Sequence, residues 1–387
     1  MRSFKEYLKE RYYNLFYDAI REFIGENKNN LSFRKNYVSY VDRITVDDIS
    51  IVTVHIRDEA GLRIGFDVII ETELELYDYR NKRERIENVS QWFSCSCFGS
   101  LEDNLASIEI VNVEEYSGKR FSNHSLTDQF VPVVCHEDLD GIATEFLKKY
   151  YPKALLEPLP IDAYMLAETM NLSIIERTIT TEGTIFGQLF FRDAKQSFYD
   201  DNGETIIETV PADTIVLDPA IFFLRDIGTI NHTIVHECVH KEYHYKKFLF
   251  ESIYDIERVS TRCGTAGDAE YSSSNESYLE WQANALASHI LMPELPFKKR
   301  ALELLKKYGE ERGEYNLIDV LPAVIDQLAD FFGVSRIAAK IRLVECGYED
   351  AIGVYDYIYY KEKPNGNVNY NPIFFLQAIR CLWLDWI

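Results

Sequence analysis

The stretch that decides the fold is "NHTIVHECVHKEYHYKK", residues 231–247, in which a histidine stands at every fourth position. These histidines are His232, His236, His240 and His244. We expect a helix here, so each four-residue step advances one turn plus about 40°. From the first histidine to the last, the stripe therefore turns by about 120° and climbs about 18 Å. One metal ion cannot contact all four, and only a neighbouring pair can chelate it.

The residue that follows the first histidine distinguishes the three neighbouring pairs. In HExxH sites this residue is a glutamate, whose carboxylate takes a proton from metal-bound water. Thr233 and Lys241 follow the first histidine of the outer pairs, whereas Glu237 follows that of the middle pair. The sequence therefore predicts His236 and His240 as metal ligands and Glu237 as the general base.

The other two histidines of the stripe have weaker cases as ligands. His244 is expected to pack one turn beyond the site, or to support a ligand from behind. His232 either faces the substrate or lies on the surface.

A catalytic zinc site usually has three protein ligands and one open position. The pattern HExxHxxGxxH would supply a third histidine, but Tyr243 replaces its glycine and Lys246 replaces its last histidine. The third ligand must therefore come from another segment. Residues 276–293, "ESYLEWQANALASHILMP", predict a helix in which Glu276 and Glu280 both fall inside the apolar arc. That arc runs through Leu279, Ala283, Leu286, Ala287, Ile290 and Leu291.

Glu276 and Glu280 differ in the other roles open to them. Residues 273–276, "SSNE", form a capping box that would use Glu276 at the start of the helix. Glu280 has no such role, and an inward carboxylate is costly unless it is paired or metal-bound. We therefore predict Glu280 as the third ligand, with a buried ion pair to a histidine of the first helix as the alternative. His289 points away from the arc and is not expected to be a ligand.

Composition is that of an ordinary globular chain. Of its 387 residues 47% are hydrophobic and 27% are charged, enough for sizeable cores in two or three domains.

The net charge of -22 argues against a dominant interaction with nucleic acid, because phosphates attract clustered Lys and Arg. The charged residues 1–20 predict an amphipathic helix rather than a signal peptide. No apolar run is long enough to span a membrane. The seven cysteines do not show the even, closely spaced pattern of a secreted protein held by disulfides. We therefore expect a cytoplasmic protein.

The order of the expected elements predicts an α+β protein of three parts. Residues 1–150 combine a helix with β hairpins from about Asp47 to Tyr116, which are rich in β-branched and aromatic residues. Residues 151–310 combine a mixed sheet with the histidine helix. Residues 311–387 contain a helix, a "GVS" turn and a second helix, in a helix-turn-helix-like arrangement followed by a C-terminal tail.

The second of these C-terminal helices suggests DNA binding as a competing function. Arg336, Lys340 and Arg342 could contact phosphates, and Ser335 is placed to cap the helix. Acidic residues outnumber these basic ones, namely Asp319, Asp326, Asp330, Glu345, Glu349 and Asp350. We therefore interpret the segment as a packing or docking module, and direct DNA binding is not expected.

The blocks "HECVH" and "EWQANALASHILMP" resemble the ImmA/IrrE-type metallopeptidases, in which HExxH is followed by a block of the form ExxANxxAxxxLMP. The matching residues of the second block are Glu280, Ala283, Asn284, Ala287, Leu291, Met292 and Pro293. The resemblance spans about Ile161 to Tyr348. It implies a zincin-like metallopeptidase domain that binds Zn²⁺ with Glu280 as the third ligand, in agreement with the helical arc.

The chain also departs from this family. Cys238 and Val239 stand where Leu-Gly is usual, and Leu286 stands where an aromatic residue is common. The spacing from the second histidine of the motif to Glu280 is long and includes the polar residues 263–275, which we interpret as a surface insertion near the cleft. The N-terminal domain lies outside the resemblance.

The resemblance implies a metalloendopeptidase of bacterial regulatory circuits, often on mobile elements, that cleaves a co-encoded helix-turn-helix transcriptional repressor. Glu237 would accept the proton of zinc-bound water and pass it to the leaving amine. The residue that stabilises the oxyanion is left open among Tyr243, Tyr271, Tyr278 and His232. Two alternatives are a DNA-binding or partner-binding regulator with a non-catalytic zinc site, and a sensor whose N-terminal domain gates the protease.

Overall fold

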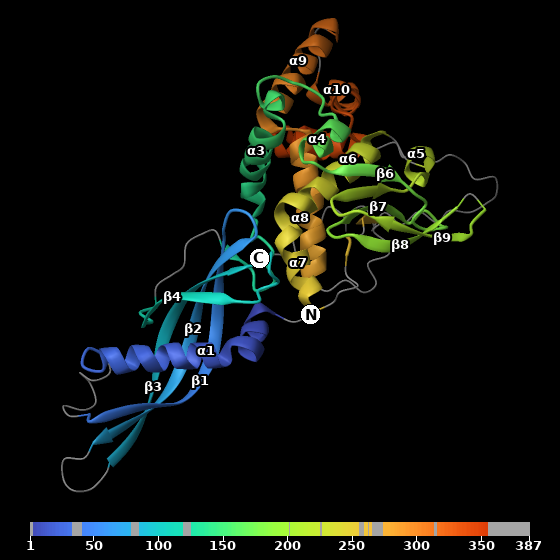
Figure 1. Cartoon of the computed structure of the whole chain (residues 1–387). Helices are drawn as coiled ribbons and strands as arrows, with labels where there is room; N and C mark the ends of the chain where they lie inside the picture. The colour runs from blue at the N-terminus through green and yellow to red at the C-terminus, as the bar shows by residue number, and fades with distance from the viewer. Residues whose placement is uncertain are drawn as a thin grey trace, which may run out of the picture.

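The N-terminal part of the chain is a helix laid across a long antiparallel sheet (Figure 1). The computed structural model describes residues 3–32, 41–78, 85–118, 125–200, 202–224, 227–254, 259–261, 263–264, 274–312 and 316–354. Helix α1 (Phe4–Asn27) begins at Ser3, whose side chain and Glu6 form a capping box. The sheet has the order β4-β3-β2-β1-β5. Its strands are β1 (Arg43–Asp58), β2 (Arg63–Asp78), β3 (Arg85–Ser100), β4 (Ile108–Glu115) and β5 (Ser125–Leu126).

Alternation along these strands explains why α1 covers the sheet. Successive side chains of a strand point to opposite faces, so every second residue of β2 and β3 can be buried against the helix. The buried set on α1, β2 and β3 includes Phe4, Leu8, Phe16, Ile20, Phe66, Val68, Ile70, Phe93 and Cys95. The hairpins predicted between Asp47 and Tyr116 are therefore confirmed, although the first strand begins earlier, at Arg43.

A second sheet is mixed, as the sequence predicted. Its order is β11-β7-β10-β6, and β10 pairs parallel with β6 and antiparallel with β7. The strands are β6 (Ser173–Glu176), β7 (Ile185–Phe190), β10 (Thr214–Leu217) and β11 (Cys263–Gly264). Strands β8 (Ala194–Tyr199) and β9 (Thr205–Val210) form a separate hairpin that the sequence analysis did not identify. The mixed α+β class is thus confirmed for the described residues.

Most of the helices lie to one side of this second sheet (Figure 1). The helices that follow α1 in the described residues are α3 (Leu139–Tyr150), α4 (Ala163–Thr169), α5 (Ala220–Leu224), α6 (Ile227–Val239), α7 (Tyr245–Tyr254), α8 (Ser274–Leu291), α9 (Glu294–Arg312), α10 (Leu317–Phe332) and α11 (Arg336–Glu345). Pro293 separates α8 from α9. Pro296 lies in the first turn of α9, where a helix needs no backbone N–H from it.

The histidine helix is not a regular α-helix throughout. Residues His240–His244 form a π-helical turn between α6 and α7. A π turn contains one more residue than an α-helical turn, so the expected drift of the histidine stripe does not continue past His240. The rings of His240 and His244 consequently lie side by side, with centroids 5.0 Å apart.

The helical segment from α6 to α7 joins two hydrophobic clusters. Ile234, Val235 and Val239 belong to the cluster around the second sheet, which contains described residues between Val131 and Val354. Leu249 and Phe250, at the other end, belong to the cluster between α1 and the first sheet. One continuous helical segment therefore contributes to both clusters.

The turn between α10 and α11 follows the predicted boundaries. Gly333 ends α10 with a left-handed φ of 61°, which glycine adopts without a steric penalty. The Ser335 side chain accepts a hydrogen bond from the Ala338 N–H and caps α11. The predicted C-terminal tail after Val354, the cap at Ser273 and Glu276, and Tyr271 fall outside the described residues and side chains. The domain boundaries near residues 150 and 310 stay predictions.

None of the helices in the described ranges is both long and apolar enough to span a membrane.

Gly228 lies in the first turn of α6, directly against the turn between α10 and α11. A Cβ atom at this position would stand 2.4 Å from both the Ser335 nitrogen and the Val334 carbonyl carbon. Because backbone atoms cannot yield as a flexible side chain does, Gly228→Ala should lower the free energy of unfolding by about 1–3 kcal/mol. Urea denaturation measures the change.

The control for this substitution is Gly141→Ala in α3, where a Cβ would meet no atom within 4 Å. Alanine favours a helix over glycine, so this variant should be unchanged or more stable by up to about 1 kcal/mol. Equal destabilisation of both variants would contradict the close contact at Gly228.

Candidate metal centre

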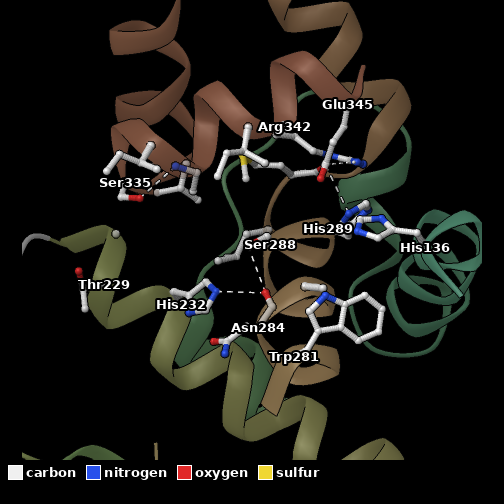
Figure 2. A pocket seen from close by; sticks show the side chains of 18 residues that line it. His136, Thr229, His232, Trp281, Asn284, Ser288, His289, Ser335, Arg342 and Glu345 are labelled. Atoms are coloured by element: carbon white, nitrogen blue, oxygen red, sulfur yellow. Dashed lines mark hydrogen bonds and ion pairs between the residues drawn. The ribbon is translucent and has the colours of Figure 1, made fainter. Parts of the chain in front are cut away.

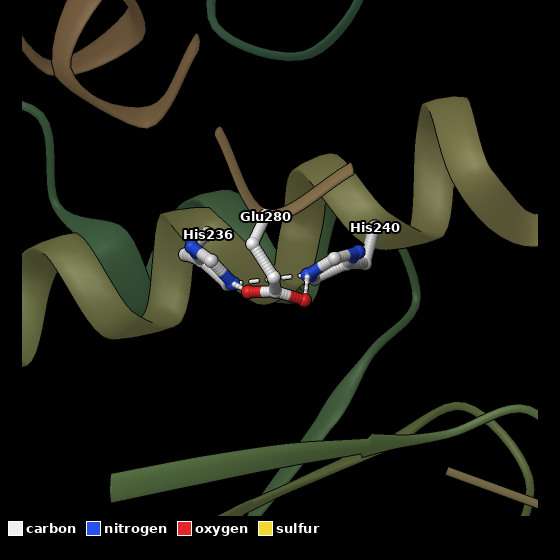
Figure 3. Close-up of side chains that lie close together, drawn as sticks. All are labelled: His236, His240 and Glu280. Atoms are coloured by element: carbon white, nitrogen blue, oxygen red, sulfur yellow. Dashed lines mark hydrogen bonds and ion pairs between the residues drawn. The ribbon is translucent and has the colours of Figure 1, made fainter. Parts of the chain in front are cut away.

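Three of the predicted site residues converge where α6 and α8 pack together (Figure 3). His236 and His240 lie on one face of the histidine helix, and Glu280 lies on α8. Glu280 Oε2 is 3.2 Å from His236 Nε2, and Glu280 Oε1 is 3.4 Å from His240 Nε2. The two Nε2 atoms are 2.9 Å apart. One donor atom from each residue lies within 4.8 Å of the others, which makes this group a candidate metal site. We call it the His-His-Glu cluster.

The spacing of the His-His-Glu cluster fits a small tetrahedral ion. Bonds of about 2.0–2.2 Å separate neighbouring ligand atoms of a tetrahedral zinc by about 3.3–3.5 Å. Two of the three distances are close to this range, and the third is somewhat shorter. Both imidazoles are fully buried, whereas the Glu280 side chain keeps 39% of its surface exposed. Solvent therefore reaches the cluster from the Glu280 side, where an open coordination position is needed.

Asn284 orients the first imidazole of the cluster. Its side-chain oxygen is 3.1 Å from His236 Nδ1. Because a carbonyl oxygen only accepts hydrogen bonds, Nδ1 donates to it, and Nε2 is the nitrogen left to bind an ion shared with Glu280. Asn284 stands one turn after Glu280 on α8, so one helix face supplies both the carboxylate and the partner of His236.

Charge also favours an ionised Glu280. Burial raises the pKa of its carboxyl, but the neighbouring His240 and His236 rings outweigh this effect, and its pKa lies well below the ordinary value. An ionised carboxylate beside two imidazoles is a donor set typical of zinc.

Glu237 lies on α6, and its side chain contacts Thr261 in the segment that follows α7. Its side chain is fully buried, and burial raises the pKa of its carboxyl. The Thr261 hydroxyl accepts a hydrogen bond from the Leu189 N–H at 2.8 Å, so its single proton is donated to Glu237 Oε2, 2.6 Å away. The described residues supply no partner for Glu237 Oε1. One carboxylate oxygen is therefore fixed in place, and the other is available to accept a proton.

The remaining histidines of the stripe lie outside the His-His-Glu cluster. His244 is fully buried behind His240, and burial, with the neighbouring His240, lowers its pKa well below the ordinary value. His232 is half-buried, and its Nε2–H donates to the Asn284 carbonyl oxygen at 3.3 Å. Burial and His236 lower the pKa of His232 to about 4, so this ring is neutral at physiological pH.

Three of the four candidates for oxyanion stabilisation are engaged elsewhere. The Tyr278 hydroxyl is 2.9 Å from both the N–H and the carbonyl oxygen of Val134. The Tyr243 hydroxyl donates to the Ile142 carbonyl oxygen at 3.4 Å. Tyr271 lies outside the described residues. His232 lies one turn before His236, with ring centroids 6.3 Å apart, but its Nε2–H is engaged by the Asn284 carbonyl oxygen. It could donate to an oxyanion only by giving up this hydrogen bond.

A cavity of about 370 Å³ opens beside His232, between α6, α8 and α11 (Figure 2). Its walls are mostly apolar and include Trp281, Met292, Ile337 and Ile341. His289 also lines this cavity, where its Nδ1 is 2.9 Å from Asp140 Oδ1. His289 lies outside the His-His-Glu cluster.

The basic residues of α11 are used inside the protein. Arg342 is only 1% exposed, donates to the Met292 carbonyl oxygen at 3.0 Å and pairs with Asp140. It therefore cannot contact DNA phosphates, contrary to the competing function considered above. Arg336 pairs with Asp326, and Lys340 donates to the Val354 carbonyl oxygen at 2.6 Å.

Sequence reasoning missed three residues that support the site. Asn284 belongs to the second block but had no role assigned to it. No sequence pattern marks Gln282 or Thr261 as a site residue. Gln282 looks like any polar residue of a helix, and Thr261 lies just before the polar insertion. Their contacts become visible only when distant segments are brought together.

Residues 231–344 match the peptidase family described as the IrrE N-terminal-like domain. The match begins in α6, includes the His-His-Glu cluster and ends in α11. This part of the chain is therefore similar to the ImmA/IrrE-type family, which confirms the predicted resemblance there, although the resemblance was expected to begin at Ile161. The family supports a zinc metallopeptidase. The comparison with curated proteins found no match.

The engaged basic residues of α11 lead to a prediction about DNA. We expect no sequence-specific binding of duplex DNA at physiological salt in a gel-shift assay, because phosphate binding needs exposed Lys and Arg. Salt-sensitive, sequence-specific binding that is lost on Arg336→Ala and Lys340→Ala would contradict this expectation.

Proposed function

We propose that this protein is a cytoplasmic zinc-dependent metalloendopeptidase, in which His236, His240 and Glu280 hold the ion and Glu237 is the general base. The observation that carries this proposal is the convergence of three suitable donor atoms beside a buried carboxylate. The family match over residues 231–344 supports the same chemistry. The zincin-like character of the domain is part of the proposal.

The proposed mechanism assigns one task to each residue. When bound, zinc lowers the pKa of a water ligand and polarises the scissile carbonyl group. Glu237 Oε1 accepts the proton of that water and passes it to the leaving amine. Thr261 holds the other oxygen of the same carboxylate, and Asn284 holds the ring of His236. His232 would contact the oxyanion if its Nε2–H left the Asn284 carbonyl oxygen.

The proposed substrate is a helix-turn-helix transcriptional repressor encoded beside this protein, in a bacterial regulatory circuit and often on a mobile element. This assignment comes from the family resemblance. The apolar cavity beside His232 supports it in a general way, because a folded repressor segment could dock an apolar side chain there. Helix α11, which forms one wall of that cavity, would then serve docking rather than DNA binding.

The main alternative is a regulator with a non-catalytic zinc site that binds DNA or a protein partner. The observation that favours it is the full burial of Glu237, since a general base must reach water. A third reading, in which residues 1–150 sense a signal and gate the protease, is compatible with the peptidase. Metal analysis and a substitution of Glu237 distinguish the peptidase from the regulator with a non-catalytic zinc site.

The proposed ligand set predicts one zinc ion per chain. Metal analysis of the purified protein should find near-stoichiometric zinc in the wild type and a clear loss in Glu280→Ala, because two imidazoles alone hold the ion weakly. Undiminished zinc in a folded Glu280→Ala protein would remove Glu280 from the ligand set and bring Glu276 forward.

The proposed base predicts a variant that binds zinc and does not cleave. Glu237→Gln keeps the size of the side chain and all three proposed ligands, so zinc should stay bound while proton transfer is lost. A general base contributes about 10²–10⁴-fold, so cleavage of the repressor should fall to near background. Single-turnover assays with the repressor encoded beside the protein measure the effect.

His236→Ala is the matched control and should lose both zinc and activity. Cleavage by Glu237→Gln at the wild-type rate would exclude Glu237 as the base. A wild-type protein that holds zinc but cleaves no co-encoded repressor would favour the non-catalytic alternative.

A further inference from the structure

A chain of hydrogen bonds runs from the back of His240 to the backbone of a distant segment. His240 Nδ1 and His244 Nδ1 are 2.9 Å apart, and His244 Nε2 is 2.9 Å from Gln282 Oε1. The Gln282 amide nitrogen donates to the Pro132 carbonyl oxygen at 2.7 Å. All three side chains are fully buried. We call His240, His244, Gln282 and the Pro132 carbonyl the histidine relay.

The direction of every hydrogen bond in the relay follows from its far end. The Pro132 carbonyl oxygen can only accept, so the amide nitrogen of Gln282 faces it and Oε1 faces His244. Oε1 can also only accept, so His244 Nε2 carries a proton. His244 is fully buried, and among the described residues its hydrogen-bond partners include no carboxylate, so the ring is neutral and its Nδ1 is an acceptor. His240 Nδ1 must then be the donor.

We propose that Gln282, acting through His244, is a positioning residue that fixes which nitrogen of His240 binds the metal. With the proton held on Nδ1, His240 turns the lone pair of Nε2 toward Glu280 and His236. Asn284 imposes the same arrangement on His236, so residues 282 and 284 of one helix prepare both imidazoles. The proposal rests on the ligand set of the proposed function.

The relay ends on a segment that is also tied to the N-terminal part. Phe130 packs against Phe4 and Phe250, with ring centroids 5.0 and 4.9 Å apart. Four residues later, Val134 makes two hydrogen bonds with the Tyr278 hydroxyl, one turn before Gln282 on α8. The carbonyl that orients Gln282 therefore lies between two anchored positions. A shift of this segment would be transmitted to the ring of His240.

Zinc affinity tests the relay without any substrate. Gln282→Met has a similar length and no hydrogen-bond acceptor, so competition with a chromophoric chelator should show zinc binding weakened about 10–100-fold. Ser252→Ala, on α7, is the control, because it removes the buried hydrogen bond to the Leu249 carbonyl oxygen outside the relay. Its zinc affinity should equal that of the wild type.

Gln282→Glu should restore zinc affinity to within a few-fold of the wild type. Burial favours the neutral acid, whose carbonyl oxygen can accept from His244 and whose O–H can donate to Pro132. A role confined to the stability of the fold would leave the zinc affinity of a folded Gln282→Met protein unchanged. Unchanged zinc affinity in folded Gln282→Met would overturn the proposal.

The tautomer of His240 gives a second measurement, on the metal-free wild-type protein. Nitrogen-15 NMR of the histidine rings should find the proton of His240 on Nδ1. A proton on Nε2 would overturn the proposal even if Gln282→Met failed to fold. A protein that binds zinc but cleaves nothing would contradict the peptidase function and leave the relay intact.

Discussion

The close packing of α6 against α8 on one side and against β7 on the other is the constraint from which the site follows. Ala283 and Ala287 are fully buried on α8, and their small side chains let the two helices approach. On the opposite side Gly187 faces Thr233, so closely that a Cβ would stand 2.7 Å from its methyl group. Without these three small residues, the two imidazoles and Glu280 could not share one small volume.

Local sequence patterns predicted the members of the His-His-Glu cluster but not the residues that support them. His236 and His240 are four residues apart on one helix, and Glu280 lies in the apolar arc of another. Both patterns are properties of single helices, so they can be recognised from the sequence alone. Gln282, Thr261 and Pro132 act through contacts between segments far apart in sequence. The π turn likewise depends on packing, because no residue from His240 to His244 breaks an α-helix. The sequence predicted the long strands of the first sheet, but it did not predict the β8–β9 hairpin.

Several basic side chains in this acidic protein join segments that lie far apart in the sequence. Arg342 joins α11 to α3 through Asp140 and to the end of α8 through the Met292 carbonyl oxygen. Lys246, just after the π turn, contacts Asp58 and the Glu59 carbonyl oxygen in the turn between β1 and β2. The net charge of -22 adds a general repulsion of a phosphate backbone.

The helical segment that carries His236 also delivers Phe250 to the aromatic group around Phe4 and Phe130. Any ligand that binds only the ordered form of this segment adds its binding free energy to the stability of everything the segment holds together. The two hydrophobic clusters are thereby linked thermodynamically, and melting of one removes part of the surface on which the other is built. Amide hydrogens near the Phe4 ring would thus exchange more slowly with solvent when a ligand is bound to His236 and His240, at the other end of this helical segment.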